Sequence, residues 1–351
     1  MLVAAENRKI DGEFTMDLLR KSIPIKESRR FCRRLSKDSG SNFLCAFSSL
    51  DECKRRAMYA LYAFMRISDD LVDDAPNDGD KPGTGNPRPG SVLSFTARDR
   101  LKNWRAMLRV FLLANATPTE EMYALQGGMT NDFPVDALLI FPSLFDSIER
   151  YQIPTDLFFA VLDGVEMDLT KNRYATFAEL QAYCERVASA VGLACIHIWG
   201  FEGRGTPEQE NVLELARRVG IAYQLTNILR DVKEDAVRDR VYLPLDEISA
   251  AGYSVEELKN GAVNPAFERL MRGQVDRAED YYRSSRELFA RLKPEGKRIF
   301  GLMTATYHAI LKRIAANPPS VFTERIRPSA LERLRLVARW TCFPPRALIL
   351  K

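Results

Sequence analysis

Histidine is scarce in this chain. Its 351 residues include only two histidines, His197 and His308. A histidine-rich zinc site, an HExxH motif or a Ser-His-Asp triad therefore has almost no material to draw on. Metal chemistry in this protein is expected to come from carboxylates instead.

The chain also lacks a net charge of one sign and a long apolar run. Its 51 basic and 47 acidic residues leave a net charge of only +4, whereas a dedicated nucleic-acid binder usually carries a clustered basic excess. The longest uncharged stretch, residues 187–201, is shorter than the roughly 20 residues that cross a bilayer. We expect no nucleic-acid partner and no membrane-spanning helix, and peripheral membrane contact stays open.

Paired cysteines and a signal peptide are missing as well. The six cysteines contain no CxxC pair, and the N-terminus has no signal-peptide pattern. A reducing cytosol is the simplest location. We predict a cytoplasmic protein, with peripheral contact at the inner face of the cytoplasmic membrane left open.

The composition that remains is typical of a globular, helical protein. Hydrophobic residues make up 46% of the chain and charged residues 28%, enough for a sizeable core. Long proline-free spans and the lack of alternating strand patterns predict an all-α fold. The Gly/Pro-rich segment 75–91 is expected to be a flexible loop within one domain. We predict an N-terminal extension (1–30), a single helical domain (31–318) and a basic C-terminal segment (319–351).

A first acidic stripe follows an apolar helix. Residues 57–67 are apolar almost all round and run directly into the sequence SDDLVDD. Asp69 and Asp73 are four residues apart and share a helical face, with Arg66 one turn earlier. Two unpaired carboxylates at about 5.5 Å repel by roughly 3 kcal/mol at an effective dielectric near 20. A polyvalent cation would remove that repulsion.

A second polar stripe lies on the apolar segment 222–235, which we predict to be one buried helix. Gln224, Asn227, Asp231 and Asp235 follow one another at steps of three or four residues, and apolar side chains surround them. The last three supply oxygen ligands along one line, which suits Mg²⁺. The ion usually keeps several waters and shares the phosphates of a substrate.

Each stripe has a simpler explanation. A single DDxxD is usually a solvated helix end, but two stripes on apolar helices, each with a neighbouring arginine, favour a site. Arg66 and Arg230 fit either structural ion pairs or a bidentate grip on a diphosphate. We infer a helical bundle around a central apolar cavity, whose mouth holds Mg²⁺ and a diphosphate. A substrate with an anionic head and a long hydrocarbon tail would suit it.

Four ordered segments resemble the squalene/phytoene synthase family, which joins two prenyl diphosphates head to head. They are YAFMRISDDLVDD (62–74), GVEMDL (164–169), YCERVASAVG (183–192) and QLTNILRDVKEDAVRDRVYLP (224–244). The resemblance covers roughly residues 31–311. It implies a single-domain isoprenoid synthase bundle and makes the chain a prenyltransferase with prenyl diphosphates as substrates.

The resemblance also implies roles for individual residues. Tyr183 and Tyr242 match active-site tyrosines, although Tyr183 taken by itself is better explained as a core tyrosine with a satisfied hydroxyl. Close helix packing likewise explains the small residues near Val187. The implied diphosphate contacts are Arg66 and Arg230, with further substrate contacts from Gln224, Arg240, Tyr307, Val187, Ala188 and Gly192. The implied Mg²⁺ ligands are Asp69, Asp73, Asn227, Asp231 and Asp235.

The product is predicted from segment 183–192. Its VASAVG sequence resembles the bacterial hopanoid-pathway branch, which makes presqualene diphosphate from two farnesyl diphosphates. NADPH would be needed only if the reaction continues to squalene. The alternative is a phytoene synthase that joins two geranylgeranyl diphosphates. A terpene cyclase, which should not need segment 183–192, and a non-catalytic prenyl-lipid-binding protein, which needs neither stripe, are more remote.

The C-terminal segment is strongly basic. From Arg325 onward it holds seven basic residues and one acid, Glu332, with apolar residues between them. Such a segment would dock on anionic lipid, where greasy substrates and products reside. A solvated C-terminal helix fits the pattern equally well. Contact with downstream isoprenoid-pathway enzymes is also left open.

Overall fold

The described part of the chain is helical. The computed structural model describes residues 23–38, 46–73, 96–112, 135–343, 346–348 and 350, and these form no β-strand, which confirms the all-α prediction. The predicted loop 75–91 lies outside the described residues. The elements are α2 (Ile25–Asp38), η1 (Ala46–Ser49), α3 (Glu52–Asp73), α4 (Ala97–Leu112), η2 (Val135–Ile140), α6 (Phe141–Tyr151), α7 (Asp156–Thr170), α8 (Phe177–Cys184), η3 (Glu185–Ser189), α9 (Ala190–Trp199), α10 (Gln209–Arg230), α11 (Val232–Val237), α12 (Leu245–Ala250), α13 (Val255–Lys259), α14 (Pro265–Tyr282), α15 (Ser284–Arg291), α16 (Pro294–Ala316), α17 (Ser320–Thr323) and α18 (Ala330–Thr341).

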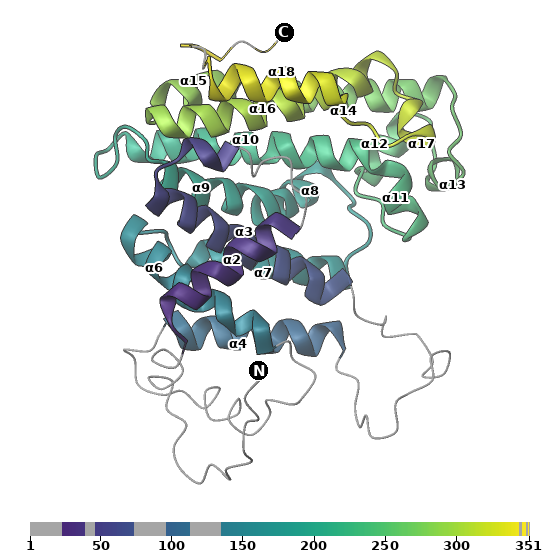
Figure 1. Cartoon of the computed structure of the whole chain (residues 1–351). Coiled ribbons are helices and arrows are strands. Elements are labelled where there is room, and N and C mark those ends of the chain that lie inside the picture. The colour runs from purple at the N-terminus through teal and green to yellow at the C-terminus, as the bar shows by residue number, and fades with distance from the viewer. Residues whose placement is uncertain are drawn as a thin grey trace.

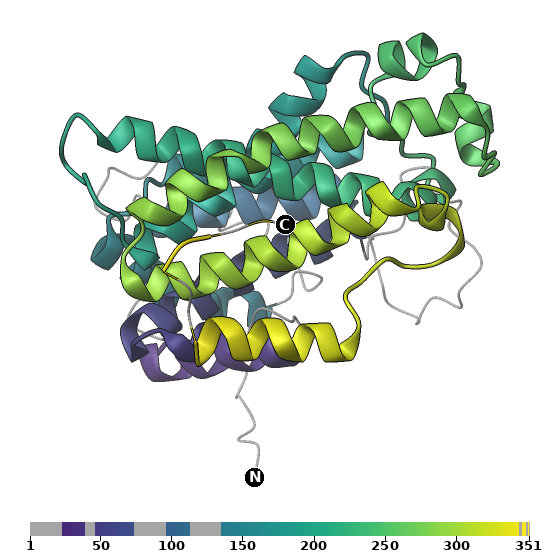
Figure 2. The ribbon, with the colours of Figure 1, turned by 90° about the horizontal axis from the view of Figure 1, so that it is seen from above.

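The helices stack in layers around α10. Figure 1 shows α4 on one face of the molecule, α3, α7 and α9 in the middle, and α14, α16 and α18 on the opposite face. Seen from above, α18 lies along the outer side of α16 (Figure 2). Helix α10 contacts α9, η3, α14, α15 and α16, so this one helix adjoins much of the bundle.

Helix α3 is fixed immediately before its acidic end. Trp104 of α4 is fully buried and stacks on Phe64 with ring centroids 5.8 Å apart. Its indole N–H donates to the Ser68 hydroxyl at 2.9 Å, and that hydroxyl donates to the Phe64 carbonyl at 2.8 Å. These contacts hold the turn that precedes Asp69.

Helix α8 continues into α9 through one π-helical turn, η3. Two glycines allow neighbouring helices to approach this turn: a Cβ at Gly164 of α7 would lie 2.5 Å from Val187 Cγ1, and one at Gly220 of α10 would lie 2.6 Å from Ser189 Cα. The Ser189 hydroxyl donates to the Arg217 carbonyl at 2.7 Å. Because π turns are rare and recur at functional sites, this turn indicates that segment 183–192 is a candidate functional segment.

The C-terminal segment joins the same core as the bundle. Trp340 of α18 is 3% exposed and packs against Gly301 of α16, where a Cβ would overlap its ring. Leu348 is buried in the same cluster. Among the described helices, none combines the length and hydrophobicity that crossing a bilayer requires.

The close approach at Gly220 predicts that glycine-to-alanine substitutions in α10 and α14 have opposite effects on stability. Gly220→Ala is expected to lower the free energy of unfolding by about 1–3 kcal/mol, because the new methyl group meets the backbone of η3 and not a flexible side chain. Denaturant unfolding followed by circular dichroism measures the change.

Gly273→Ala is the matched control. Gly273 lies in α14, is exposed, and a Cβ there would contact nothing within 4 Å. Alanine should therefore stabilise the protein by about 0.5–1 kcal/mol through helix propensity. Changes of the same sign at both glycines would contradict this account of the α10 packing.

Candidate active site

Three adjoining hollows form one cavity in the middle of the bundle. A polar mouth of about 480 Å³ adjoins an apolar chamber of about 360 Å³ and a deeper apolar pocket of about 180 Å³. Gln224 of α10 lines all three. The cavity thus runs from a charged opening into the hydrophobic interior.

Most of the residues predicted from the sequence meet in this cavity. Asp73 is the exception, because its side chain lies outside the part that the structure describes. The deeper pocket is lined by Val187, Ala188, Gly192 and Tyr307. The mouth is lined by Arg66, Asp69, Tyr183, Gln224, Asn227, Arg230, Asp231, Asp235, Arg240 and Tyr242.

The second stripe crosses a helix junction. We predicted one helix over residues 222–235, but α10 ends at Arg230 and α11 begins at Val232. Helical hydrogen bonds nevertheless continue across the junction: Asp231 N–H donates to the Asn227 carbonyl and Asp235 N–H to the Asp231 carbonyl, each at 2.9 Å. The three side chains therefore keep their common line.

Two features of this stripe fit a divalent cation. The Asn227 side-chain oxygen is buried and accepts no hydrogen bond from the described residues. Burial, and then the charge of Asp231, raise the pKa of Asp235 to about 7. A buried orphan oxygen and mutually repelling carboxylates are what oxygen-preferring Mg²⁺ satisfies.

The carboxylates are not gathered into a closed cage. No group of three His, Cys, Asp or Glu side chains within the described ranges converges closely enough to hold a metal alone. Mg²⁺ is usually bound by one or two carboxylates together with substrate phosphates and waters. The donor set therefore fits an ion that a diphosphate helps to bind.

Both predicted arginines are paired with acids of their own stripe. Arg66 forms a two-point ion pair with Asp70, with Nε–Oδ2 and Nη2–Oδ1 distances of 2.9 and 2.7 Å. Arg230 grips Asp231 through Nε, at 2.8 Å, and Nη2. The planar two-point geometry is the one that a phosphate also accepts.

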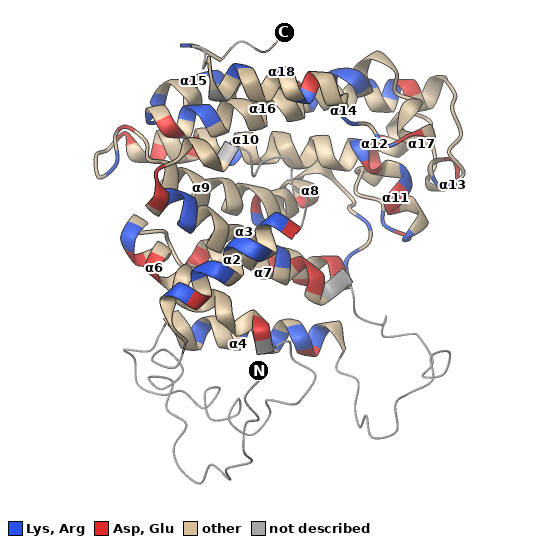
Figure 3. Ribbon diagram, in the orientation of Figure 1, with Lys and Arg blue, Asp and Glu red and all other residues tan. Residues whose placement is uncertain are grey.

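Sequence reasoning missed further charged residues at the mouth. Arg238 and Arg325 line it beside Arg240, and Figure 3 shows acidic and basic positions together at the end of the bundle where α11 lies. Arg238 falls within segment 224–244, but its position in the sequence alone indicated no role. Arg325 follows α17, far along the chain, so no local pattern placed it at the mouth.

Asp168 is the most informative missed residue. It lies in the GVEMDL segment of α7, and its carboxylate accepts hydrogen bonds from the Tyr183 hydroxyl at 3.1 Å and the Tyr242 hydroxyl at 2.8 Å. The two rings stack with centroids 5.2 Å apart. Burial first, and then the charge of Asp168, raise the pKa of both tyrosines. The pair therefore stays protonated at neutral pH.

The inner chambers are apolar and aromatic. Met58, Leu61 and Met65 of α3 face the chamber that Val161 and Val165 of α7 also line. Deeper in, Tyr307 of α16 stacks on Tyr223 with centroids 4.8 Å apart. Such walls suit a hydrocarbon chain and exclude water from it.

Sequence comparison identifies the family and relatives of this chain. Residues 36–332 match the squalene/phytoene synthase family. The phytoene synthase of Arthrospira platensis is 32% identical over 306 residues, which cover 85% of this chain and 87% of that protein. A chloroplastic phytoene synthase from an Oncidium hybrid cultivar is 32% identical over 313 residues, 89% of this chain and 67% of that protein.

Solved structures share the fold. A dehydrosqualene synthase in complex with a ligand has a TM-score of 0.69 at 24% identity, covering 91% of this chain and 97% of that one. The squalene synthase HpnC from Alicyclobacillus acidocaldarius has a TM-score of 0.65 at 22% identity, with coverages of 85% and 97%. With a match that spans nearly the whole bundle and relatives above 30% identity, the chain belongs to the squalene/phytoene synthase family of prenyltransferases.

Proposed function

We propose that this protein catalyses the Mg²⁺-dependent head-to-head condensation of two molecules of farnesyl diphosphate. The family reaction, head-to-head joining of prenyl diphosphates, follows from the family itself. The observation that carries the proposal for this chain is the cavity itself: Asp69 of the first stripe and the three predicted ligands of the second stripe line the mouth of an apolar interior.

The mouth would hold the metal and the diphosphates. Asp69 and Asp73 on one side, and Asn227, Asp231 and Asp235 on the other, would bind Mg²⁺, which would neutralise the negative charge of the departing diphosphate. Once Asp231 ligates a metal, the guanidinium of Arg230 becomes available for phosphate oxygens. Arg66 and Asp70 allow the same exchange, and Arg240 would add a further contact.

The interior would protect the allylic cation that diphosphate departure leaves behind. Val187, Ala188, Gly192 and Tyr307 line the deep pocket, where a hydrocarbon tail would lie and water is excluded. Tyr183 lines both the mouth and the apolar chamber, and Tyr242 lines the mouth beside it. Their hydroxyl oxygens would stabilise positive charge and handle the proton that is lost.

Asp168 is proposed as the positioning residue for this pair. One carboxylate accepts from both hydroxyls, so it fixes where the two phenolic oxygens lie. Asp168 also contributes negative charge beside the cavity, which favours a cation there. Its role is therefore to orient and polarise the tyrosines.

The substrate and product are the finer part of the proposal. The VASAVG sequence of segment 183–192, which resembles the hopanoid-pathway branch, supports farnesyl diphosphate and a cyclopropyl product, presqualene diphosphate. If the reaction continued to squalene, NADPH would be the reductant. A phytoene synthase acting on geranylgeranyl diphosphate is the second candidate, which the names of the sequence relatives favour.

Loss of a proposed metal ligand should remove turnover without unfolding the protein. Asp231→Asn is expected to lower turnover by about a hundredfold or more, because a neutral amide neither binds Mg²⁺ as strongly nor balances Arg230. Release of diphosphate from farnesyl and geranylgeranyl diphosphate, measured with and without Mg²⁺, tests this. Asp276→Asn, the same change at an exposed residue of α14, should leave turnover unaltered, and an active Asp231→Asn enzyme would refute the assignment.

Loss of the shared acceptor should redirect the reaction. Asp168→Asn can accept from only one of the two tyrosine hydroxyls, so we expect turnover to fall about tenfold to a hundredfold. A larger share of prenyl alcohol, formed when water captures the cation, should accompany the loss. Mass spectrometry gives the ratio of alcohol to condensed product.

Two variants separate positioning from general damage to α7. Tyr183→Phe should shift the product ratio in the same direction as Asp168→Asn, because it also removes an oriented hydroxyl. Asp163→Asn, on the same helix but paired with Arg105 at the surface, should not shift it. An unchanged product ratio in Asp168→Asn would assign Asp168 a structural role only.

Product analysis distinguishes the two substrate candidates. Purified protein with Mg²⁺ is expected to condense farnesyl diphosphate with a higher kcat/KM than geranylgeranyl diphosphate, and to accumulate the cyclopropyl diphosphate without a nicotinamide cofactor. Addition of NADPH tests whether squalene follows. A preference for geranylgeranyl diphosphate with phytoene as product would replace the first candidate by the second.

A further inference from the structure

Exposed apolar side chains concentrate on the C-terminal helix. Of the large apolar residues that the described part of the chain leaves exposed, Leu331 (56%) and Leu334 (66%) lie on α18, and Phe343 (77%) follows its end. The same helix buries Trp340 on its inner side. Single exposed apolar residues are common, but three in one short segment indicate a surface that something covers.

Basic residues share this outer surface. Arg335 and Arg339 are exposed on α18, four and eight residues after Leu331 and so on the same side of the helix. Exposed Arg327 and Arg346 flank the helix. None of these four arginines forms an ion pair with an acidic residue of the described ranges. Figure 3 shows basic positions distributed along this outer helix.

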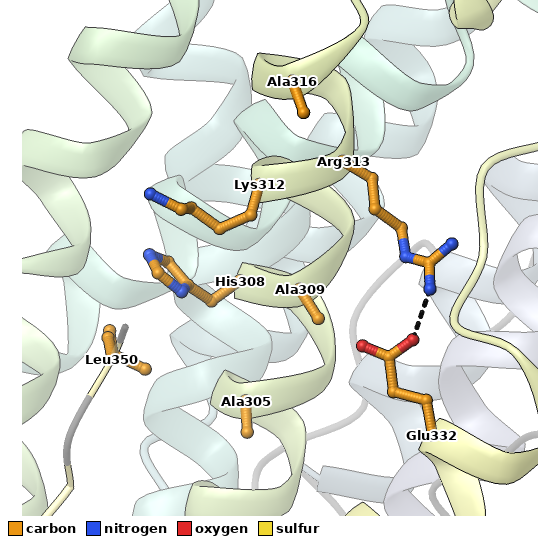
Figure 4. A pocket seen from close by; sticks show the side chains of 8 residues that line it. All are labelled: Ala305, His308, Ala309, Lys312, Arg313, Ala316, Glu332 and Leu350. Carbon is orange, nitrogen blue, oxygen red and sulfur yellow. Dashed lines mark hydrogen bonds and ion pairs between the residues drawn. The ribbon is translucent and has the colours of Figure 1, made fainter.

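The acid of α18 does not offset this charge. Glu332 is the only acidic residue of the helix, and it forms an ion pair with Arg313 of α16. Figure 4 shows that pair beside a hollow of about 360 Å³ on α16, with Glu332 turned toward α16. What α18 presents outward is therefore apolar and positively charged.

We propose that this surface, formed by Leu331, Leu334, Arg335, Arg339 and Phe343, docks on an anionic lipid bilayer. Interleaved apolar and basic side chains on one face are the pattern of helices that lie in the membrane interface, and arginines are attracted to anionic headgroups. Helix α2 is a useful contrast. It also exposes basic residues, but its apolar Phe31 and Leu35 pack against the core, so it offers charge alone.

A second copy of the chain is a poorer occupant. A two-fold dimer through this face would bring the arginines of one α18 against those of the other. An acidic protein would match the charge but would need a defined groove for the leucines, and a fluid bilayer does not. The family's prenyl substrates are themselves amphiphilic, which gives a bilayer contact a purpose. The inference does not depend on which product is formed.

Vesicle co-sedimentation of the full chain tests the proposal. The protein should pellet with vesicles of equal parts phosphatidylglycerol and phosphatidylcholine, and not with pure phosphatidylcholine. Leu331→Ser/Leu334→Ser and Arg335→Glu/Arg339→Glu should each weaken binding by roughly tenfold or more. Because lipid binding is read without turnover, its failure is distinguishable from failure of the proposed reaction.

The control reverses the same amount of charge elsewhere. Arg98 and Lys102 are exposed on α4, which lies on the opposite face of the molecule (Figure 1), so Arg98→Glu/Lys102→Glu should bind vesicles like the parent protein. Equal melting curves establish that all variants fold. Absence of binding to anionic vesicles, or equal losses in the α4 and α18 variants, would overturn the proposal. So would binding that the leucine substitutions leave unchanged, because a purely electrostatic contact would equally suit an acidic protein.

Discussion

Charged groups placed at the ends of apolar helices are the constraint on which this site depends. Helices α3 and α10 each bury an apolar side, yet carboxylates from both, Asp69 on α3 and Asp231 at the end of α10, line one mouth. The described residues of that mouth include five arginines and four aspartates, so its charge is nearly balanced within the protein. A divalent cation would tip this balance toward positive, which is the sign that a diphosphate requires. Metal and diphosphate thus favour each other's binding.

The bundle supplies the rigidity that such a balance needs. Buried carboxylates and guanidinium groups are costly when their geometry loosens, because each leaves an unpaired charge in a low-dielectric setting. Here the anchoring contacts lie directly behind the charges: Trp104 and Ser68 fix the turn before Asp69, and the α10 hydrogen bonds continue through Asp231 to Asp235. Gly164 and Gly220 hold the π turn against both neighbouring helices. The acidic stripes therefore lie on helices or at their ends, whereas Arg240, Tyr242 and Arg325 come from the segments between helices.

The sequence predicted what local periodicity encodes and missed what distant contacts create. The apolar faces of α3 and α10, and the polar stripes on them, could be read from spacings of three and four residues. The break between α10 and α11 at Asp231 could not be predicted from these spacings, because the helical hydrogen bonds and the polar stripe continue across it. Asp168 was missed because its partners, Tyr183 and Tyr242, are 15 and 74 residues away. The π turn was also missed; it lies where Gly164 and Gly220 allow α7 and α10 to approach closely. Asp73 and the loop 75–91 lie outside the described residues, so their predicted roles stay predictions.

The small net charge of the chain conceals a separation of roles. At the mouth, arginines lie beside acids, and Arg230 forms an ion pair with Asp231. Positive and negative side chains therefore offset each other within the site. On α18, Arg335 and Arg339 form no ion pair with an acidic residue of the described ranges, while the one acid of that helix pairs with Arg313. Charge that is balanced within the site can be rearranged when a metal binds the carboxylates and an anion binds the guanidinium groups. Charge that is unbalanced and exposed acts over about 8–10 Å in physiological salt and attracts an anionic surface. The mouth and the outer face of α18 therefore differ in whether their arginines are paired with acids. Only the folded structure determines this pairing.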